Sequence, residues 1–247
     1  MVQNQGSNSN KPCMDIVCLA WTKMARGKCF AGIDKNTGKW ARIVPEYGEL
    51  QEETFAYQAQ TFLCQDYNIL RVYHKGNKNS SPPHSEDYIW DSNNKCQLIG
   101  KITNTEAFLS KVSENNLLMN KDKFIHTILK EQNKSLILVG PVIITKGQLF
   151  KNMHNPNEID LRFFFEIPSV NYVASKVPNG GIKCTSIYWT NYFKKMMHSR
   201  NSSVIFFDDN EFRDMIGNYK NLYISIGLTR EFEGENWPMI IGIHPTK

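Results

Sequence analysis

The 247-residue chain has no apolar run close to the roughly 20 residues that a membrane-spanning helix needs. Its N-terminal residues are polar and lack the charged start and the apolar centre of a signal peptide. We therefore expect a cytoplasmic protein without a membrane partner.

Motifs of common enzyme and metal sites are also missing. The six cysteines, at 13, 18, 29, 64, 96 and 184, fit neither the paired spacing of a zinc site nor the dense framework of small secreted domains. The chain has no phosphate-binding glycine loop, no nucleophile elbow and no metalloprotease helix. We predict reduced thiols, no metal, no cofactor and no catalytic residues, so that the protein is not an enzyme.

Charge is modest, whereas apolar residues are plentiful. The formal net charge of +5 permits a polyanionic partner without demanding one. A chain that is 41% hydrophobic and 12% aromatic can bury a large core. Only residues 1–12, rich in Gln, Asn, Ser and Gly, are predicted to form a disordered tail.

Short apolar segments bounded by turn residues run through both halves, a pattern typical of β-strands. In the first half they cover residues 14–21, 29–33, 40–44, 68–73, 88–90 and 97–102. In the second half they cover 135–145, bent at Gly140-Pro141, then 161–165, 171–173, 182–189, 222–228 and 239–243, with a turn predicted at 178–181. The fold is therefore expected to be mainly β.

Helical spacing is confined to two regions. Phe108, Leu109 and Val112, and then Phe124, Ile125, Ile128 and Leu129, predict two short helices separated near Asn120. A third helix would be capped by Asp209, carry Phe212, Met215 and Ile216 on one face, and stop at Gly217. We predict an N-terminal unit over residues 13–132 that ends in helix, and a C-terminal unit over 133–247.

Seven segments form an ordered set of motifs along the chain: Ile16-Val17-Cys18-Leu19-Ala20, Gly27 to Asp34, Thr37 to Val44, Pro83 to Tyr88 with Trp90, Ser135 to Leu138, Tyr223 to Arg230, and Gly242-Ile243-His244-Pro245. In this order they resemble the dual OB-containing domain family of bacterial proteins. Ala41 and Ser85 depart from the family pattern, where a larger apolar residue and an amide are expected. The resemblance implies two tandem OB-like five-stranded barrels, a role in recognising nucleic acid and an association with bacterial defence systems.

Positive charge and tryptophan are interleaved in the N-terminal half. OB barrels bind single strands by combining cations for phosphates with aromatic faces for bases. The alternative is that both tryptophans belong to the core and the cations solvate a turn. The predicted nucleic-acid-binding residues are Trp21, Lys23, Arg26, Lys28, Lys39, Trp40 and Arg42, joined at the closing hairpin by Arg230 and His244.

Two sets of histidine and acidic residues suggest metal binding or catalysis instead. His84, Glu86 and Asp87 could ligate a metal or move protons, although acidic residues after Pro82-Pro83 more often order a turn. The residues His154, Glu158, Asp160 and Glu166 form a loose scatter of potential nuclease ligands.

Three functional hypotheses follow from these patterns. The first is a noncatalytic module for single-stranded DNA or RNA that holds its ligand for a partner enzyme. The second is a protein-interaction or nucleotide-sensing regulatory module, and the third is a metal-dependent nuclease.

Overall fold

The computed structural model describes residues 11–23, 27–50, 52–78, 82–119, 122–152, 155, 158–174, 180–231 and 234–247. The predicted tail up to residue 10, the helix separation near Asn120 and the first half of the turn at 178–181 lie outside the described residues.

The first sheet closes into a barrel. Its strand order is β1-β2-β3-β7-β6, and β6 pairs back onto β1. The β3–β7 pairing is parallel, whereas the other pairings are antiparallel. The elements are β1 (Cys13–Lys23), β2 (Lys28–Asp34), β3 (Trp40–Val44), α1 (Glu52–Phe55), the hairpin β4 (Tyr57–Gln58) and β5 (Thr61–Phe62), β6 (Asn68–Asn77), β7 (Asp87–Trp90) and β8 (Gln97–Lys101), which extends the sheet beyond β6.

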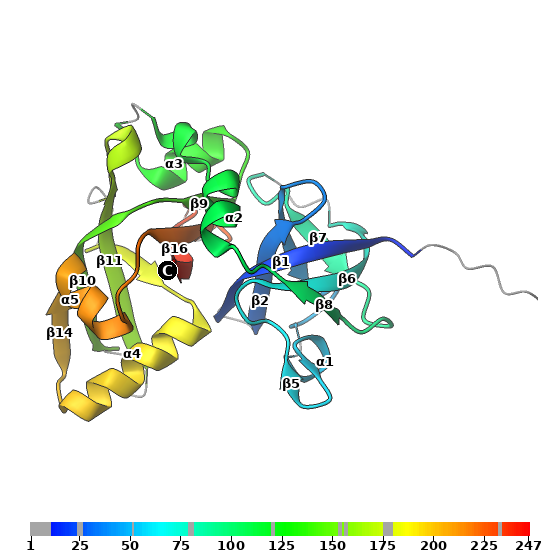
Figure 1. The fold of residues 1–247 in the computed structure, drawn as a ribbon. Helices are drawn as coiled ribbons and strands as arrows, with labels where there is room; N and C mark the ends of the chain where they lie inside the picture. The colour runs from blue at the N-terminus through cyan, green and yellow to red at the C-terminus, as the bar shows by residue number, and fades with distance from the viewer. Residues whose placement is uncertain are drawn as a thin grey trace, which may run out of the picture.

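The second sheet repeats this connectivity. Its first strand is split at Gly140-Pro141 into β9, which pairs with β15, and β10, which pairs with β11. The order continues through β13, β16 and β15, with β13–β16 parallel. The strands are β9 (Leu136–Val139), β10 (Ile143–Lys151), β11 (Ile159–Ile167), β12 (Tyr172–Val173), β13 (Ile182–Cys184), β14 (Val204–Phe207), β15 (Leu222–Leu228) and β16 (Pro238–Pro245). The predicted mainly β, tandem OB-like fold is confirmed (Figure 1).

The predicted helices form, but they pack on the second barrel. They are α2 (Thr105–Val112), the 3-10 helix η1 (Asn115–Leu118) and α3 (Ile125–Glu131). Leu118, Ile125, Ile128 and Leu129 join the core of the second sheet. The helical end that the sequence assigned to the first unit therefore contributes its apolar face to the second.

The strand predicted over 182–189 is wrong beyond its first half. β13 ends at Cys184, and helix α4 (Ile187–Arg200) begins three residues later. Trp189, Phe193 and Met197, four residues apart, bury one face of this helix in the core. That spacing was the available signal for a helix.

The helix predicted near Asp209 exists as α5 (Asp209–Ile216), but its cap is Asp208. The Glu211 amide donates to Asp208 Oδ1 at 2.9 Å, and the Asp208 amide donates to Glu211 Oε2 at 3.0 Å. This reciprocal pair satisfies two amides that the helix itself leaves unpaired.

The two barrels share an apolar layer, which we call the barrel interface. The side of β1, β2 and β3 that points out of the first barrel contributes Leu19, Ala20, Ala31, Ile33 and Trp40. Helix α2 contributes Leu109, and the second barrel contributes Leu136, Leu138, Tyr223 and Ile241. In Figure 1 the first barrel lies on the right and β9 and β16 lie beside it. A Cβ on Gly242 would stand 2.3 Å from the Leu19 carbonyl oxygen, so glycine permits this close approach of β16 to β1.

No helix in the described ranges combines the length and the hydropathy needed to span a membrane.

Candidate functional site

The two tryptophans of the predicted N-terminal site are buried. Trp21 is 7% exposed and stacks on Phe55 with ring centroids 6.2 Å apart. Trp40 is 6% exposed and lies in the barrel interface. The expectation of open indole faces is therefore wrong, and the alternative, core tryptophans, describes the structure, because both large apolar rings face packed layers.

The predicted cations of the N-terminal half do not converge on one surface. Lys23 forms an ion pair with Glu158 of the second barrel, and Lys28 forms one with Glu52. Lys39 is exposed in the β2–β3 turn. Arg26 lies outside the described residues.

Arg42 is buried in a polar cluster between the barrels, which we call the seam cluster. Its Nε lies 2.6 Å from Asp87 Oδ1, and its Nη2 lies 2.6 Å from His84 Nδ1. His84 Nε2 lies 3.1 Å from the Thr229 carbonyl oxygen, and Arg230 forms an ion pair with Asp87. The cluster therefore ties β3 and β7 of the first barrel to the end of β15 in the second.

The seam cluster shifts two pKa values. Burial and the neighbouring Arg42 and Arg230 guanidinium groups lower the pKa of His84 to about 4. Burial alone would raise the pKa of Asp87, but the same two arginines hold it below its usual value. His84 is thus neutral at pH 7 and accepts from Arg42. These contacts give His84 and Asp87 a structural role.

His244, predicted at the closing hairpin, is not on the surface. It is 0% exposed, and its Nε2 lies 2.8 Å from Ser225 Oγ. Its Nδ1 lies 3.5 Å from Asp66 Oδ2. The order of contacts resembles a Ser-His-Asp triad, which sequence reasoning missed, but Ser225 is also 0% exposed and no substrate can reach it here. The binding role predicted for His244 is therefore wrong for this arrangement.

Two of the acidic residues of the nuclease hypothesis are paired with separate lysines. Asp160 forms an ion pair with Lys183, and Glu158 forms one with Lys23. His154 lies outside the described residues. Over the described ranges, no three His, Cys, Asp or Glu side chains gather as metal ligands.

The open surface with mixed aromatic and cationic character lies on the second barrel. We call it the outer face: Lys146 and Gln148 of β10, Arg162 and Phe164 of β11, Lys183 of β13 and Phe206 of β14. Register places Phe206, Gln148, Arg162 and Lys183 in one row across the four strands, with Lys146 paired to Phe164 beside it. Their neighbours Leu149, Leu161, Phe163 and Ile182 point inward and are fully buried.

Lys146 is the centre of this face. Its Nζ lies 5.4 Å from the centroid of the Phe206 ring and 5.9 Å from that of Phe164. Phe206 is 60% exposed. Gly181 adopts a φ of +97°, and a Cβ there would stand 2.9 Å from the Phe164 ring, so glycine permits the close approach of this turn to the half-buried ring.

The outer face includes the second and third strands of its barrel, and the same two strands of the first barrel are covered. In an OB barrel, ligands bind on the face of the second and third strands. In the first barrel these strands are β2 and β3, whose outward residues Ile33 and Trp40 are covered by the second barrel. In the second barrel they are β11 and β13, which carry Arg162, Phe164 and Lys183.

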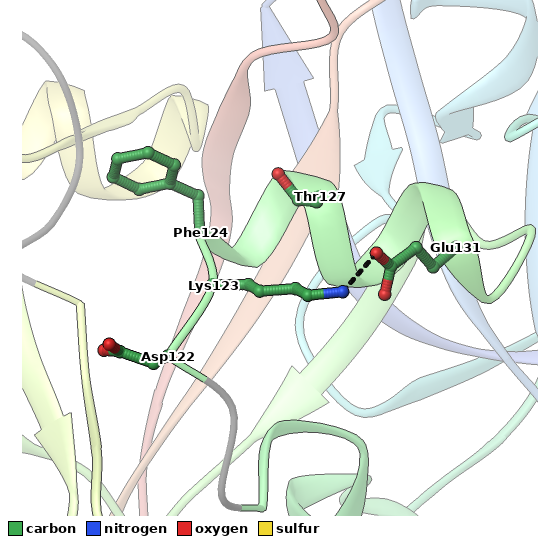
Figure 2. A pocket seen from close by; sticks show the side chains of 5 residues that line it. All are labelled: Asp122, Lys123, Phe124, Thr127 and Glu131. Carbon is green, nitrogen blue, oxygen red and sulfur yellow. Dashed lines mark hydrogen bonds and ion pairs between the residues drawn. The ribbon is translucent and has the colours of Figure 1, made fainter.

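A separate hollow of about 420 Å³ lies at the start of α3. Figure 2 shows Lys123 reaching along the helix to Glu131, with the two side chains 2.6 Å apart, while Phe124 points away from the pair. The lining carries Asp122 and Glu131 against Lys123 alone, so its charge does not favour a polyanion.

A family model described as the dual OB-containing domain matches residues 14–181, more than half of the chain. The chain belongs to this dual OB-containing domain family. The match includes the whole first barrel and, in the second, β9, β10 and β11 up to the turn before β13. Comparisons with curated proteins and with solved structures found no match.

Proposed function

We propose that this dual OB-containing domain protein is a noncatalytic module that binds single-stranded nucleic acid on its outer face. The observation that carries the proposal is Lys146 of β10 set between the rings of Phe164 and Phe206, beside the second and third strands, β11 and β13, where OB folds take ligands. The equivalent face of the first barrel is buried, which leaves one such face for a ligand.

The chemistry of the outer face suits an unpaired strand. A base can stack on the exposed Phe206 ring, and such stacking contributes about 1 to 3 kcal/mol per base. Lys146 and the guanidinium of Arg162 supply positive charge for phosphates. Bases in a duplex already stack on each other, so the rings favour a single strand.

Lys23 adds a cation near this face. It pairs with Glu158, whose pKa is lowered by Lys23 and further by the charges of Lys183 and Lys194. Lys23 and Lys183 are already paired with Glu158 and Asp160, so Lys194 of α4 is the cation that could extend the positive charge beyond β13 for a longer strand.

Two finer predictions come from the sequence and stay predictions. An association with bacterial defence systems is implied by the family resemblance, and a partner enzyme for which the ligand is held belongs to our first functional hypothesis. Co-purification of an enzyme with the tagged protein from its native host would test the first.

The test compares two lysine variants. Lys146→Glu reverses charge at the outer face, and Lys39→Glu makes the same change at the exposed turn of the first barrel. Fluorescence anisotropy with labelled single-stranded DNA and RNA should show at least about tenfold weaker binding for Lys146→Glu and little change for Lys39→Glu. The wild-type affinity should fall linearly with salt on logarithmic axes.

Three results would contradict the proposal. No binding to DNA or RNA at low salt would remove nucleic acid as the ligand. A loss of binding in Lys39→Glu alone would indicate that the binding site lies on the first barrel. A peptide or nucleotide retained through purification and displaced from Lys146→Glu would favour the regulatory alternative.

A further inference from the structure

Strand β14 ends the second sheet and carries exposed apolar side chains. In the described part of the chain it pairs with β10 and with no other strand. Figure 1 shows it at the outer left edge of the molecule. Val204 is 44% exposed and Phe206 is 60% exposed.

Within the described residues, the outward edge of β14 is protected by its short length and by Ser202 alone. The Ser203 carbonyl accepts from the Lys151 amide of β10 at 3.4 Å. Backbone groups alternate along a strand, so those of Val204 and Phe206 point away from the sheet. At the start of the edge the Ser202 hydroxyl donates to the Val204 carbonyl at 2.6 Å and accepts from the Val204 amide at 3.4 Å, and these two bonds within the chain would be exchanged on pairing. The strand has the sequence Val-Ile-Phe-Phe and contains neither a charged residue nor a proline, either of which would discourage pairing.

We infer that β14 pairs antiparallel with β14 of a second copy of this chain, which joins two second barrels into one continuous sheet. The charges flanking the strand favour this occupant. Arg200 precedes β14 and Asp208 follows it, and both are exposed. An antiparallel two-fold pairing places the basic end of each strand beside the acidic end of the other, whereas a parallel pairing would place like charges together.

The pairing also brings the exposed apolar residues of the two copies together. With Ile205 on the two-fold axis, Phe206 of each copy lies opposite Val204 of the other on the same face of the sheet. The two outer faces then adjoin across the axis. The dimer does not depend on nucleic-acid binding, but it would double the length of the proposed binding surface.

Sedimentation velocity of the full chain without nucleic acid tests the pairing. The wild type should show a reversible, concentration-dependent species of twice 28.5 kDa. Phe206→Lys and Val204→Lys should each weaken the dimer at least about tenfold, because each places a charge in the paired edge. Tyr188→Lys is the matched control, since Tyr188 is 66% exposed at the far end of α4.

A second measurement probes the flanking charges. Arg200→Glu should weaken the dimer, and added salt should weaken the wild-type dimer more than that of this variant. Circular dichroism identifies any variant that fails to fold. If Phe206→Lys fails to fold, Val204→Lys and Arg200→Glu still test the pairing. A wild type that stays monomeric at all concentrations, or a dimer that survives both edge substitutions, would overturn the pairing. Lys146→Glu, off the edge strand, should still dimerise, which separates this inference from the proposed function.

Discussion

At Asp87, two guanidinium groups share one fully buried carboxylate. Removing charges from water is expensive, so such a group persists only when its partners are close and hydrogen-bonded. Arg42 meets this condition from within the first barrel, and Arg230 meets it from the second. A pair of cations that sequence patterning assigns to a nucleic-acid surface is therefore used to join the barrels.

We predict that His84 makes stability depend on pH. In the unfolded chain its pKa is near 6.5, and in the folded protein it is about 4. Between these values the unfolded state binds the proton and the folded state does not, so acidification through this window favours unfolding. Urea unfolding over the window should show stability falling as pH falls.

His84→Gln should remove the contribution of His84 to the dependence of stability on pH. His198→Gln, at an exposed position of α4, should leave that dependence unchanged. An identical slope in wild type and His84→Gln would mean that other groups carry the pH dependence.

At the scale of elements, the contact between β1 and β16 depends on bulges in both strands. The β1–β2 register shifts between Cys18 and Ala20, and the β15–β16 register shifts between Ser225 and Ile226. Bulges bend a strand and increase its twist. Here they bring Leu19 and Gly242 together.

We predict that Gly242→Ala destabilises the protein by about 2 kcal/mol or more, because the new Cβ overlaps backbone that cannot move alone. The nearest atoms would be the Leu19 carbonyl oxygen at 2.3 Å and His244 Nε2 at 2.6 Å. Gly100→Ala is the control, since its Cβ would meet only the Ile69 side chain at 3.5 Å. Equal midpoints of chemical unfolding for the two variants would show that the interface adapts.

At the scale of the whole molecule, the barrel interface makes two barrels into one cooperative unit. Separation would expose Trp40, Tyr223 and Leu138 to water. We predict a single unfolding transition, with tryptophan fluorescence and far-ultraviolet circular dichroism coinciding.

Leu138→Asp, which buries a charge in the barrel interface, should separate the two signals, whereas Leu98→Asp, at a 46% exposed position of β8, should not. Two wild-type transitions would show that the barrels unfold independently.

The local pattern of residues was enough to predict most strands. Leu161, Phe163 and Phe165 alternate with polar or half-buried neighbours, and all three are fully buried in β11. A likeness in sequence between two hairpins was less informative: Gly32-Ile33 and Gly227-Leu228 are each followed by a charged turn, a glycine and a tryptophan. These hairpins hold the second and third strands of one barrel and the fourth and fifth of the other, so they are not equivalent positions.

Sequence alone determined the strand segments, the short helices and the family, because these depend on side-chain alternation, turn residues and the order of motifs along the chain. Only the tertiary structure decided which face of each barrel meets water. Trp40 and Phe206 are both aromatic residues on outward strand faces, yet one is covered and the other is 60% exposed. The difference arises because burial of apolar area between distant strands set the packing of the barrels, and no local pattern records which face a second barrel will cover.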